Sequence, residues 1–407
     1  MTKEIVHMKK LMKVFAVACL SAMTLTACSN DSGSGTPDTP NDSGTAGTDA
    51  VKIGLHYELT GDVADYGTAE SKGSHLAIKL ANEAAGSDKY VAVEYDDKSD
   101  PTESVSLSTK LVSDGVAGVV GPATSGASAA SYPILNDAKV PVISPSATAN
   151  NQTLVNPDDP TSAVYDYVFR VCFEDSYQGA AMAQYAVDNL SAQKAAIYGS
   201  SSSDYALGLK EAFTEQFEKL GGTIVASESY QDKDTDFSSV LTTLASKEFD
   251  VLYIPGYYNE AGLIIKQARD MGINVPIIGA DGFDSTTLVE LAGASALNDV
   301  FFTTAYTTVG ASDKLQAFID AFKAEYGEEP AMFAALAFDA TNLLIQAIET
   351  AGSTDTAAIQ KALTEVNFSG VTGDFTFDET HTPIKSVLVV ELVDGVQSTA
   401  VSVSPTE

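Results

Sequence analysis

Short apolar runs alternate with longer segments of helical periodicity along most of the chain. Residues 51–55 form the first apolar run, and residues 68–85 follow with Leu76, Ile78 and Leu80 in helical spacing. Repeated units of this kind predict parallel sheets with helices on both faces. The series restarts near residue 165, after a polar stretch. We therefore expect an α/β protein with two mostly parallel sheets, one in each of two lobes.

The same pattern predicts the other elements. Further strands are expected at residues 91–95, 118–120, 140–143, 168–171, 195–198, 223–227, 251–254, 275–278, 300–304, 375–377 and 386–392. Further helices are expected at 102–113, from 125 onward, and at 178–189, 204–220, 260–271, 313–326, 333–351 and 356–366.

Small hydroxyl residues gather after two neighbouring strands of the first series. Ser125 opens a helix after the strand at 118–120, and Ser146 and Thr148 follow the strand at 140–143. A helix N-terminus favours an anion, and ligands of open α/β sheets bind beyond the carboxyl ends of the strands. Each hydroxyl alone is as well explained as a helix cap. Two such turns after adjacent strands indicate half of a binding cleft for a small carboxylate.

Aromatic residues and one acid occupy the matching positions in the second series. Tyr205, Tyr257 and Asp281 each follow a predicted strand, and Tyr66 follows the first strand of the chain. Taken singly, the tyrosines are typical packing residues and Asp281 is a typical turn residue. Hydroxyl and N–H donors on one lobe, with a carboxylate and tyrosines on the other, suit a zwitterion.

The charge of the chain narrows the possible partners. The 407 residues carry 55 acidic and 23 basic side chains, a formal net charge of −32. Nucleic-acid binding depends on Lys and Arg, so we expect no nucleic-acid partner. The negative charge also disfavours binding to anionic lipid surfaces.

The N-terminus predicts the compartment. Basic residues at 9, 10 and 13 precede an apolar run at 14–24 that is too short to span a membrane. Residues 25–28, Leu-Thr-Ala-Cys, resemble a bacterial lipobox. We therefore expect a signal peptide at 1–27, lipidation of Cys28 and a flexible tether at 28–50. An ordinary signal peptide with an incidental cysteine is the alternative. After cleavage and lipidation only Cys172 stays free, so no intrachain disulfide is expected.

Catalytic signatures are lacking in the sequence. It contains no HExxH or CxxC pair, no GxSxG elbow, no GxxxxGK[ST] loop and no GxGxxG after a strand. His56 ends the first strand and could face the cleft, but a histidine without a positioned nucleophile is more typical of a structural role. We expect no catalysis, no metal and no cofactor. An amidase-type hydrolase is the weakest alternative.

The chain resembles the branched-chain amino-acid (leucine/isoleucine/valine) binding proteins of ABC importers from about residue 51 to about residue 392. The resemblance rests on the collinear succession of DVADYG at 62–67, YDDKSDP at 95–101, VGPATSGAS at 120–128, VPVISPSAT at 140–148, FR at 169–170, DSYQG at 175–179, KDTDFSS at 233–239, GYYNEAGLIIKQAR at 256–269 and ADGF at 280–283.

This resemblance implies a two-lobed type I periplasmic-binding fold with three hinge crossovers. The N-lobe would take residues 51–169 and 304–378, and the C-lobe residues 170–303 and 384–403. It also implies an extracytoplasmic protein that works with ABC importer permease subunits. Together with the lipobox, we expect a monomer anchored to the membrane through lipidated Cys28. A sensor domain that binds the same molecules remains an alternative.

The resemblance also assigns roles to the ligand-binding residues. Ser125 and Thr148 would bind a ligand carboxylate, and Ser146 would contribute its backbone carbonyl. Asp281 would pair with the ligand ammonium. Tyr66, Tyr205 and Tyr257 would form an aromatic wall, and Phe333 would line the side-chain pocket. Relatives of this fold also take other amino acids, short amides, urea and aromatic acids, so the sequence leaves the side chain of the ligand open.

Overall fold

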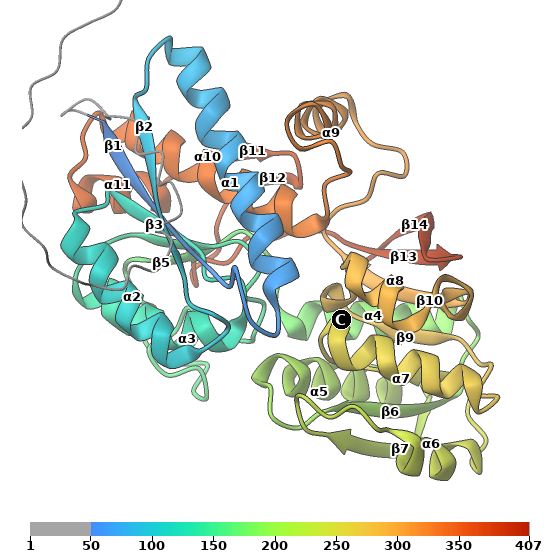
Figure 1. Ribbon diagram of the computed structural model, residues 1–407. Helices are drawn as coiled ribbons and strands as arrows, with labels where there is room; N and C mark the ends of the chain where they lie inside the picture. The colour runs from blue at the N-terminus through green and yellow to red at the C-terminus, as the bar shows by residue number, and fades with distance from the viewer. Residues whose placement is uncertain (1–49, 407) are drawn as a thin grey trace, which may run out of the picture. The chain divides into compact units, whose positions relative to one another are not determined.

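The computed structural model describes residues 50–406, and the predicted signal peptide, Cys28 and the tether up to residue 49 lie outside the described residues. The first sheet has five parallel strands in the order β2-β1-β3-β4-β5 (Figure 1). Its strands are β1 (Val51–Tyr57), β2 (Tyr90–Asp96), β3 (Gly118–Val120), β4 (Val142–Ser144) and β5 (Val168–Arg170).

Helices cover both faces of this sheet because neighbouring strand residues point to opposite sides. Val120, Ile143 and Phe169 belong to the large hydrophobic core, whereas Val119 and Val142, each one residue earlier, belong to a separate core cluster. On the large-core side pack α1 (Ala64–Ala85) and α10 (Met332–Ala351). On the other side pack α2 (Pro101–Asp114) and α3 (Ser125–Asp137). The predicted doubly covered sheet is thereby confirmed.

The second sheet has seven strands in the order β14-β13-β10-β9-β8-β6-β7. Five of them are parallel, namely β6 (Lys194–Ser200), β7 (Thr223–Tyr230), β8 (Val251–Tyr253), β9 (Ile277–Gly279) and β10 (Val300–Thr304). The two C-terminal strands, β13 (Val387–Val393) and β14 (Val396–Val403), are antiparallel. Each lobe of the predicted α/β fold therefore has its own sheet, and parallel pairing predominates.

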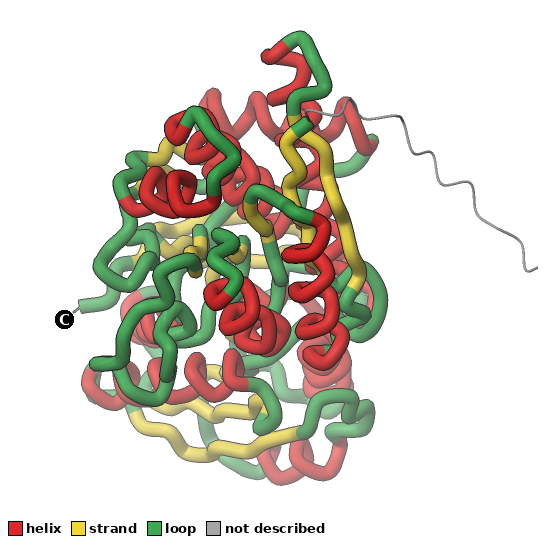
Figure 2. The backbone as a smooth tube through the Cα atoms, turned by 90° about the vertical axis from the view of Figure 1, so that its left-hand side faces the viewer, coloured by secondary structure: helices red, strands yellow, loops and turns green. Residues whose placement is uncertain are grey.

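The remaining helices accompany the second sheet or follow β10. They are α4 (Asp175–Asp188), α5 (Asp204–Lys219), α6 (Ser238–Ala245), α7 (Tyr258–Asp270), α8 (Thr286–Ala292), α9 (Asp313–Tyr326) and α11 (Thr356–Thr364), with short 3-10 turns η1 (Asp281–Phe283) and η2 (Ala294–Leu297). A two-stranded sheet joins β11 (Phe368–Gly370) to β12 (Gly373–Phe375). Helices beside strands are seen throughout the backbone in Figure 2.

Among residues 50–406, one helix, α10, is long and apolar enough to cross a membrane by length and composition alone. Within its apolar segment, 78% of the residues are buried inside the protein. The helix packs against α1 and the first sheet. Its apolar surface is thus accounted for by the core.

Buried polar contacts lie next to the segments that cross between the two sheets. Arg170, at the end of β5, is fully buried and donates through Nε to Thr382 Oγ1 at 2.9 Å. Lys385 Nζ donates to the carbonyl of Val171 at 2.8 Å. These bonds join the segment after β5 to the segment before β13, which are two of the three predicted crossovers.

Candidate functional site

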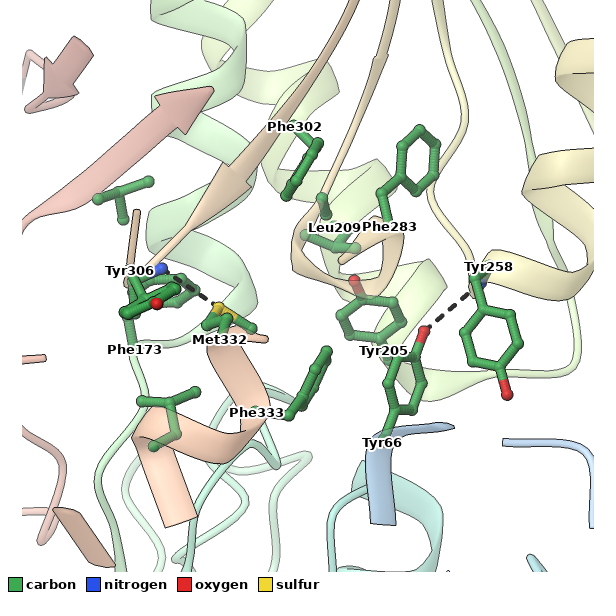
Figure 3. Packing of buried hydrophobic residues seen from close by; sticks show 14 of the residues in the cluster. Tyr66, Phe173, Tyr205, Leu209, Tyr258, Phe283, Phe302, Tyr306, Met332 and Phe333 are labelled. Carbon is green, nitrogen blue, oxygen red and sulfur yellow. Dashed lines mark hydrogen bonds between the residues drawn. The ribbon is translucent and has the colours of Figure 1, made fainter. Parts of the chain in front are cut away.

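A small cavity of about 10 Å³ lies where residues following strands of the two sheets meet. Ten residues line it: Tyr66, Ala123, Thr124, Ser125, Ser146, Tyr205, Tyr257, Asp281, Gly282 and Phe333. Seven of the eight predicted ligand-binding residues are among them; Thr148 is the exception. Figure 3 shows Tyr66, Tyr205 and Phe333 converging from different elements.

The N-terminus of α3 supplies hydrogen-bond donors on one side of the cavity. Thr124 caps the helix, accepting from Ala127 N at 3.3 Å. Ser125 Oγ accepts a hydrogen bond from Ala149 N at 3.1 Å, so its own hydrogen is free to be donated. The helix dipole adds partial positive charge at the same point. This side can hold an anion.

A buried carboxylate shapes this turn from behind. Glu58 accepts hydrogen bonds from Ala123 N at 3.0 Å and from both Thr124 N at 2.9 Å and Thr124 Oγ1 at 2.7 Å. Burial, and then the nearby charge of Asp97, raise the pKa of Glu58. The three donors offset part of that effect and fix the turn that carries Ser125.

Ser146 lines the cavity, and its hydroxyl is used within the protein. Its hydroxyl hydrogen-bonds within the protein, to the carboxyl of Glu70 and to Ala123 O, the latter at 2.8 Å. Burial raises the pKa of Glu70 well above its usual range, which favours the protonated carboxyl. This arrangement agrees with the minor side-chain role expected for Ser146.

Thr148 lies next to the cavity without lining it. Its side chain is 1% exposed and Oγ1 has no hydrogen-bond partner among residues 50–406. The carbonyl of Thr148 accepts from Asp175 N at 2.8 Å, which ties this turn to the start of α4. The Thr148 side chain lies close to the Asp175 carboxyl and lowers its pKa, against the larger raising effect of burial.

Asp281, in η1, provides the one carboxylate of the cavity lining. Its Oδ1 accepts from Tyr205 OH at 2.7 Å and from Gln178 Nε2 at 3.1 Å. Burial raises the pKa of Asp281 to about 6, against the lowering effect of these bonds. Since the ten lining residues include no Lys, Arg or His, a cationic ligand group is the natural partner of this carboxylate.

Aromatic rings form the wall between these two ends. Tyr205 and Tyr257 stack with ring centroids 5.0 Å apart, and Tyr66 meets Tyr257 edge-on at 5.7 Å. Phe333, at the start of α10, lies 4.3 Å from the ring of Tyr66. Gly282 is required beside them, because a Cβ there would come within 2.9 Å of both Tyr205 Oη and Gly256 O. This wall offers apolar contact surface to a ligand side chain.

Sequence reasoning did not assign Glu58, Glu70, Asp175 or Gln178 to the site. Glu70 lies four residues after Tyr66 on α1, and this helical spacing could have indicated that it faces the same way. Gln178 stands inside the DSYQG segment, but nothing in the sequence shows that its amide meets Asp281. These contacts arise from the packing of distant segments.

His56 and Cys172 are buried and do not belong to the cavity lining. His56 is fully buried, with Nε2 3.2 Å from Ser104 Oγ and 3.3 Å from Asp97 Oδ2. It therefore has a structural role and does not line the cleft. Burial raises the pKa of the Cys172 thiol to about 12, which disfavours the reactive thiolate. Within residues 50–406, no three His, Cys, Asp or Glu side chains are grouped so as to hold a metal ion.

Comparisons with known proteins agree with this architecture. A model of the periplasmic binding protein family matches residues 50–397. The Leu/Ile/Val-binding protein homolog 3 of Brucella melitensis is 32% identical over 336 residues, which cover 81% of this chain and 88% of that protein.

Two solved structures show the same fold. The branched-chain amino acid transporter substrate binding protein LivJ of Streptococcus pneumoniae, solved in complex with isoleucine, has a TM-score of 0.82 and 41% identity, covering 88% of this chain and 100% of that one. The leucine binding protein LivK of Thermotoga maritima has a TM-score of 0.80 and 33% identity, covering 88% and 99%. The chain therefore belongs to the type I periplasmic binding protein family, and its sequence and fold group it with the substrate-binding proteins of branched-chain amino-acid ABC transporters.

Proposed function

We propose that this protein is an extracytoplasmic, lipid-anchored receptor that captures a small α-amino acid between two lobes and delivers it to an ABC importer permease. A branched aliphatic side chain is the preferred ligand side chain. The observation that carries the proposal is the pairing of opposite chemistries across one cavity: the donors of Ser125 and the α3 N-terminus at one end, and the Asp281 carboxylate at the other. The names of the relatives support the same ligand class.

The proposed binding mode uses each wall of the cavity for one part of the ligand. The ligand carboxylate meets Ser125 Oγ and the N-terminus of α3, its ammonium meets Asp281, and its side chain lies against Tyr66, Tyr257 and Phe333. Hydrogen bonds to charged groups contribute about 1.5–3 kcal/mol each. Burial of a leucine-sized side chain adds about 1.5–3 kcal/mol. After the cost of association, a dissociation constant of about micromolar is reasonable.

Urea and simple amides fit this cavity less well. They carry no ammonium, so the buried carboxylate of Asp281 would lose solvent without gaining a charged partner. An uncompensated buried charge is strongly unfavourable. An aromatic acid leaves Asp281 unpaired for the same reason.

A calorimetric panel of the twenty amino acids tests the ligand class. We expect leucine, isoleucine and valine to bind most tightly. Leucinamide and 4-methylpentanoate, which each lack one charged group, should bind much more weakly.

Ser125→Ala should weaken leucine binding. Ser113 is an exposed serine of α2, so Ser113→Ala should leave leucine binding unchanged. Binding of urea or benzoate, with no amino acid bound, would refute the proposal.

The lipid anchor requires a separate test because Cys28 lies outside the described residues. Cells grown with a labelled fatty acid should transfer the label to the wild-type protein and to Cys19→Ser, whose cysteine falls in the predicted signal peptide. Cys28→Ser should carry no label. Equal labelling of Cys28→Ser and wild type would show that Cys28 is not the lipidated residue.

A further inference from the structure

Gln178 bridges two buried acids behind the cavity. It lies on α4 and is fully buried. Its Nε2 donates to Asp175 Oδ1 at 2.8 Å and to Asp281 Oδ1 at 3.1 Å. An amide NH₂ has two hydrogens, and both are used by these two carboxyl groups. Gln178 therefore fixes the distance between an acid of α4 and the acid of the cavity.

Two donors on the opposite side fix the orientation of this amide. Gln178 Oε1 accepts from Thr303 Oγ1 at 2.7 Å and, more weakly, from Asp281 N at 3.5 Å. If the amide were flipped, its NH₂ group would face these donors, and the two acids would face its oxygen. The surrounding hydrogen bonds thus specify one orientation. Thr303 belongs to β10, so the amide is anchored to the second sheet.

The hydrogen bonds to Asp281 occupy only one of its two carboxylate oxygens. Tyr205 OH and Gln178 Nε2 both donate to Oδ1, and Tyr205 OH in turn accepts from Gly282 N at 2.9 Å. With Oδ1 held twice, Oδ2 is the oxygen that remains for a ligand. We propose that Gln178 is a positioning residue that, with Tyr205, locks the Asp281 carboxylate so that Oδ2 receives the ligand ammonium. This inference rests on the amino-acid-binding function proposed above.

The alternative role of Gln178 is packing alone, in which its side chain fills space in the core and has no effect on Asp281. Gln178→Met keeps much of the volume and removes both N–H donors. If Gln178 acts through Asp281, the variant should lose about 10- to 100-fold in affinity for leucine, the usual effect of removing a hydrogen bond to a charged group. Gln184→Met provides the matched control, since Gln184 is a largely buried residue of the same helix and bonds to Asp188 and Thr406, away from the cavity lining.

A double-mutant cycle separates the two roles. In the Asp281→Asn background, Gln178→Met should cost much less leucine affinity than in wild type, because the residue it positions has already lost its charge. Weak complexes can be measured by ligand-observed NMR. Equal losses in both backgrounds would mean that Gln178 acts independently of Asp281, and the inference would be wrong.

The pH dependence of leucine binding gives a second readout. The Gln178 hydrogen bond stabilises the charged form of Asp281, so its removal should move the loss of leucine affinity to higher pH. The groups that face Asp281 are Asp175, Asp284, Tyr66, Tyr205, Tyr253 and Cys172. An unchanged profile in Gln178→Met would contradict the inference.

A second variant distinguishes a loss of folding from a loss of Asp281 positioning. Thr303→Val leaves Gln178 in place but removes the hydroxyl that orients its amide, and it should shift affinity and pH profile in the same direction by a smaller amount. If Gln178→Met unfolds, the Thr303→Val result decides: no change there overturns the inference. If wild type binds leucine and Asp281→Asn weakens it while Gln178→Met does not, the inference alone fails. If wild type binds no amino acid, both the inference and the proposed function fail.

Discussion

Buried carboxyl groups at the cavity differ in how many donors they receive. Asp281 has two side-chain donors on Oδ1, and its pKa rises only to about 6. Asp175 lies deeper, with Oδ2 unpaired among residues 50–406, and burial followed by the charge of Asp281 raises its pKa well above the usual range. Asp281 is thus the acid best able to carry a negative charge at neutral pH. The neighbouring Asp175 favours its neutral form.

Leucine affinity should therefore depend on pH through Asp281. Burial raises the pKa of Asp281 to about 6, so the carboxyl group is half protonated near pH 6 and the carboxylate predominates only above it. As pH falls through that value, protons compete with the ligand ammonium, and affinity should fall by up to about tenfold per pH unit. Calorimetry between pH 5 and pH 8 checks this. Asp281→Asn, which cannot titrate, should show a much flatter profile; constant wild-type affinity across that range would contradict the assignment.

The residues that line the cavity could be predicted from the sequence, whereas the residues that hydrogen-bond to them from outside the lining could not. Ser125, Tyr205 and Asp281 follow strand ends, where the fold class places ligands, and each lines the cavity. Gln178 and Glu70 act through other residues on distant segments. Thr148 was assigned by resemblance and lies just outside the lining, with its hydroxyl buried and unpaired among the residues described. The ligand-binding roles of Ser125, Thr148, Tyr205 and Asp281 remain predictions.

At the scale of elements, the close packing of α1 on α10 supports Tyr66 and Phe333. Both residues lie near the first turn of their helices, and their rings are 4.3 Å apart. The helices approach closely because Gly73 has no side chain: a Cβ there would lie 2.1 Å from Ala334 O. A backbone atom cannot move aside as a flexible side chain can.

Gly73→Ala should therefore destabilise the protein despite the higher helix propensity of alanine. We expect a loss of about 1–3 kcal/mol in the free energy of unfolding from overpacking, measured by urea titration. Gly126→Ala is the matched control, because Gly126 is exposed on α3 and a Cβ there meets nothing within 4 Å. It should change stability by less than about 1 kcal/mol. Equal effects of the two substitutions would show that the α1–α10 contact is looser than described.

Most elements follow from apolar periodicity, and the exceptions have physical reasons. The strand expected at 275–278 is shifted to Ile277–Gly279, and Pro276 lacks the N–H needed for sheet pairing. The edge strand β14 was not predicted because half of its sequence, VQSTAVSV, is polar and most of it is exposed; it forms by pairing with β13. The expected strand at 375–377 is likewise shifted, to β12, which pairs with the unpredicted β11.

At the scale of the whole described chain, residues at the start of α1 bind directly to the second sheet's loops. Tyr66 OH donates to Gly282 O at 2.6 Å, and Asp65 Oδ2 accepts from Ser285 Oγ at 2.5 Å. Met332 N, at the start of α10, donates to Asp284 Oδ2 at 2.9 Å. These contacts join the starts of α1 and α10 to the loop after β9, as expected of a closed arrangement. We expect a ligand to enter when these contacts break.

Ligand binding should shift the protein towards this closed arrangement through motion of near-rigid lobes about the crossovers. Small-angle scattering should give a smaller radius of gyration with saturating leucine than without it. Asp65→Ala removes an acceptor that joins the lobes without lining the cavity, so it should weaken leucine binding by making closure less favourable. An identical scattering profile with and without saturating ligand would count against hinge closure.

In the proposed binding mode, the affinity for an amino acid depends most on the pairing of Asp281 with the ligand ammonium. The most direct measurement is the affinity of wild type and Asp281→Asn for leucine, by calorimetry at pH 7.5. Removing one partner of a buried charge pair typically costs about 2–5 kcal/mol, or about 30- to several-thousand-fold in affinity. Asp270→Asn, an exposed acid at the end of α7, should bind leucine as wild type does. We predict a loss in that range for leucine and a far smaller change for 4-methylpentanoate; leucine binding by Asp281→Asn with wild-type affinity would contradict the account.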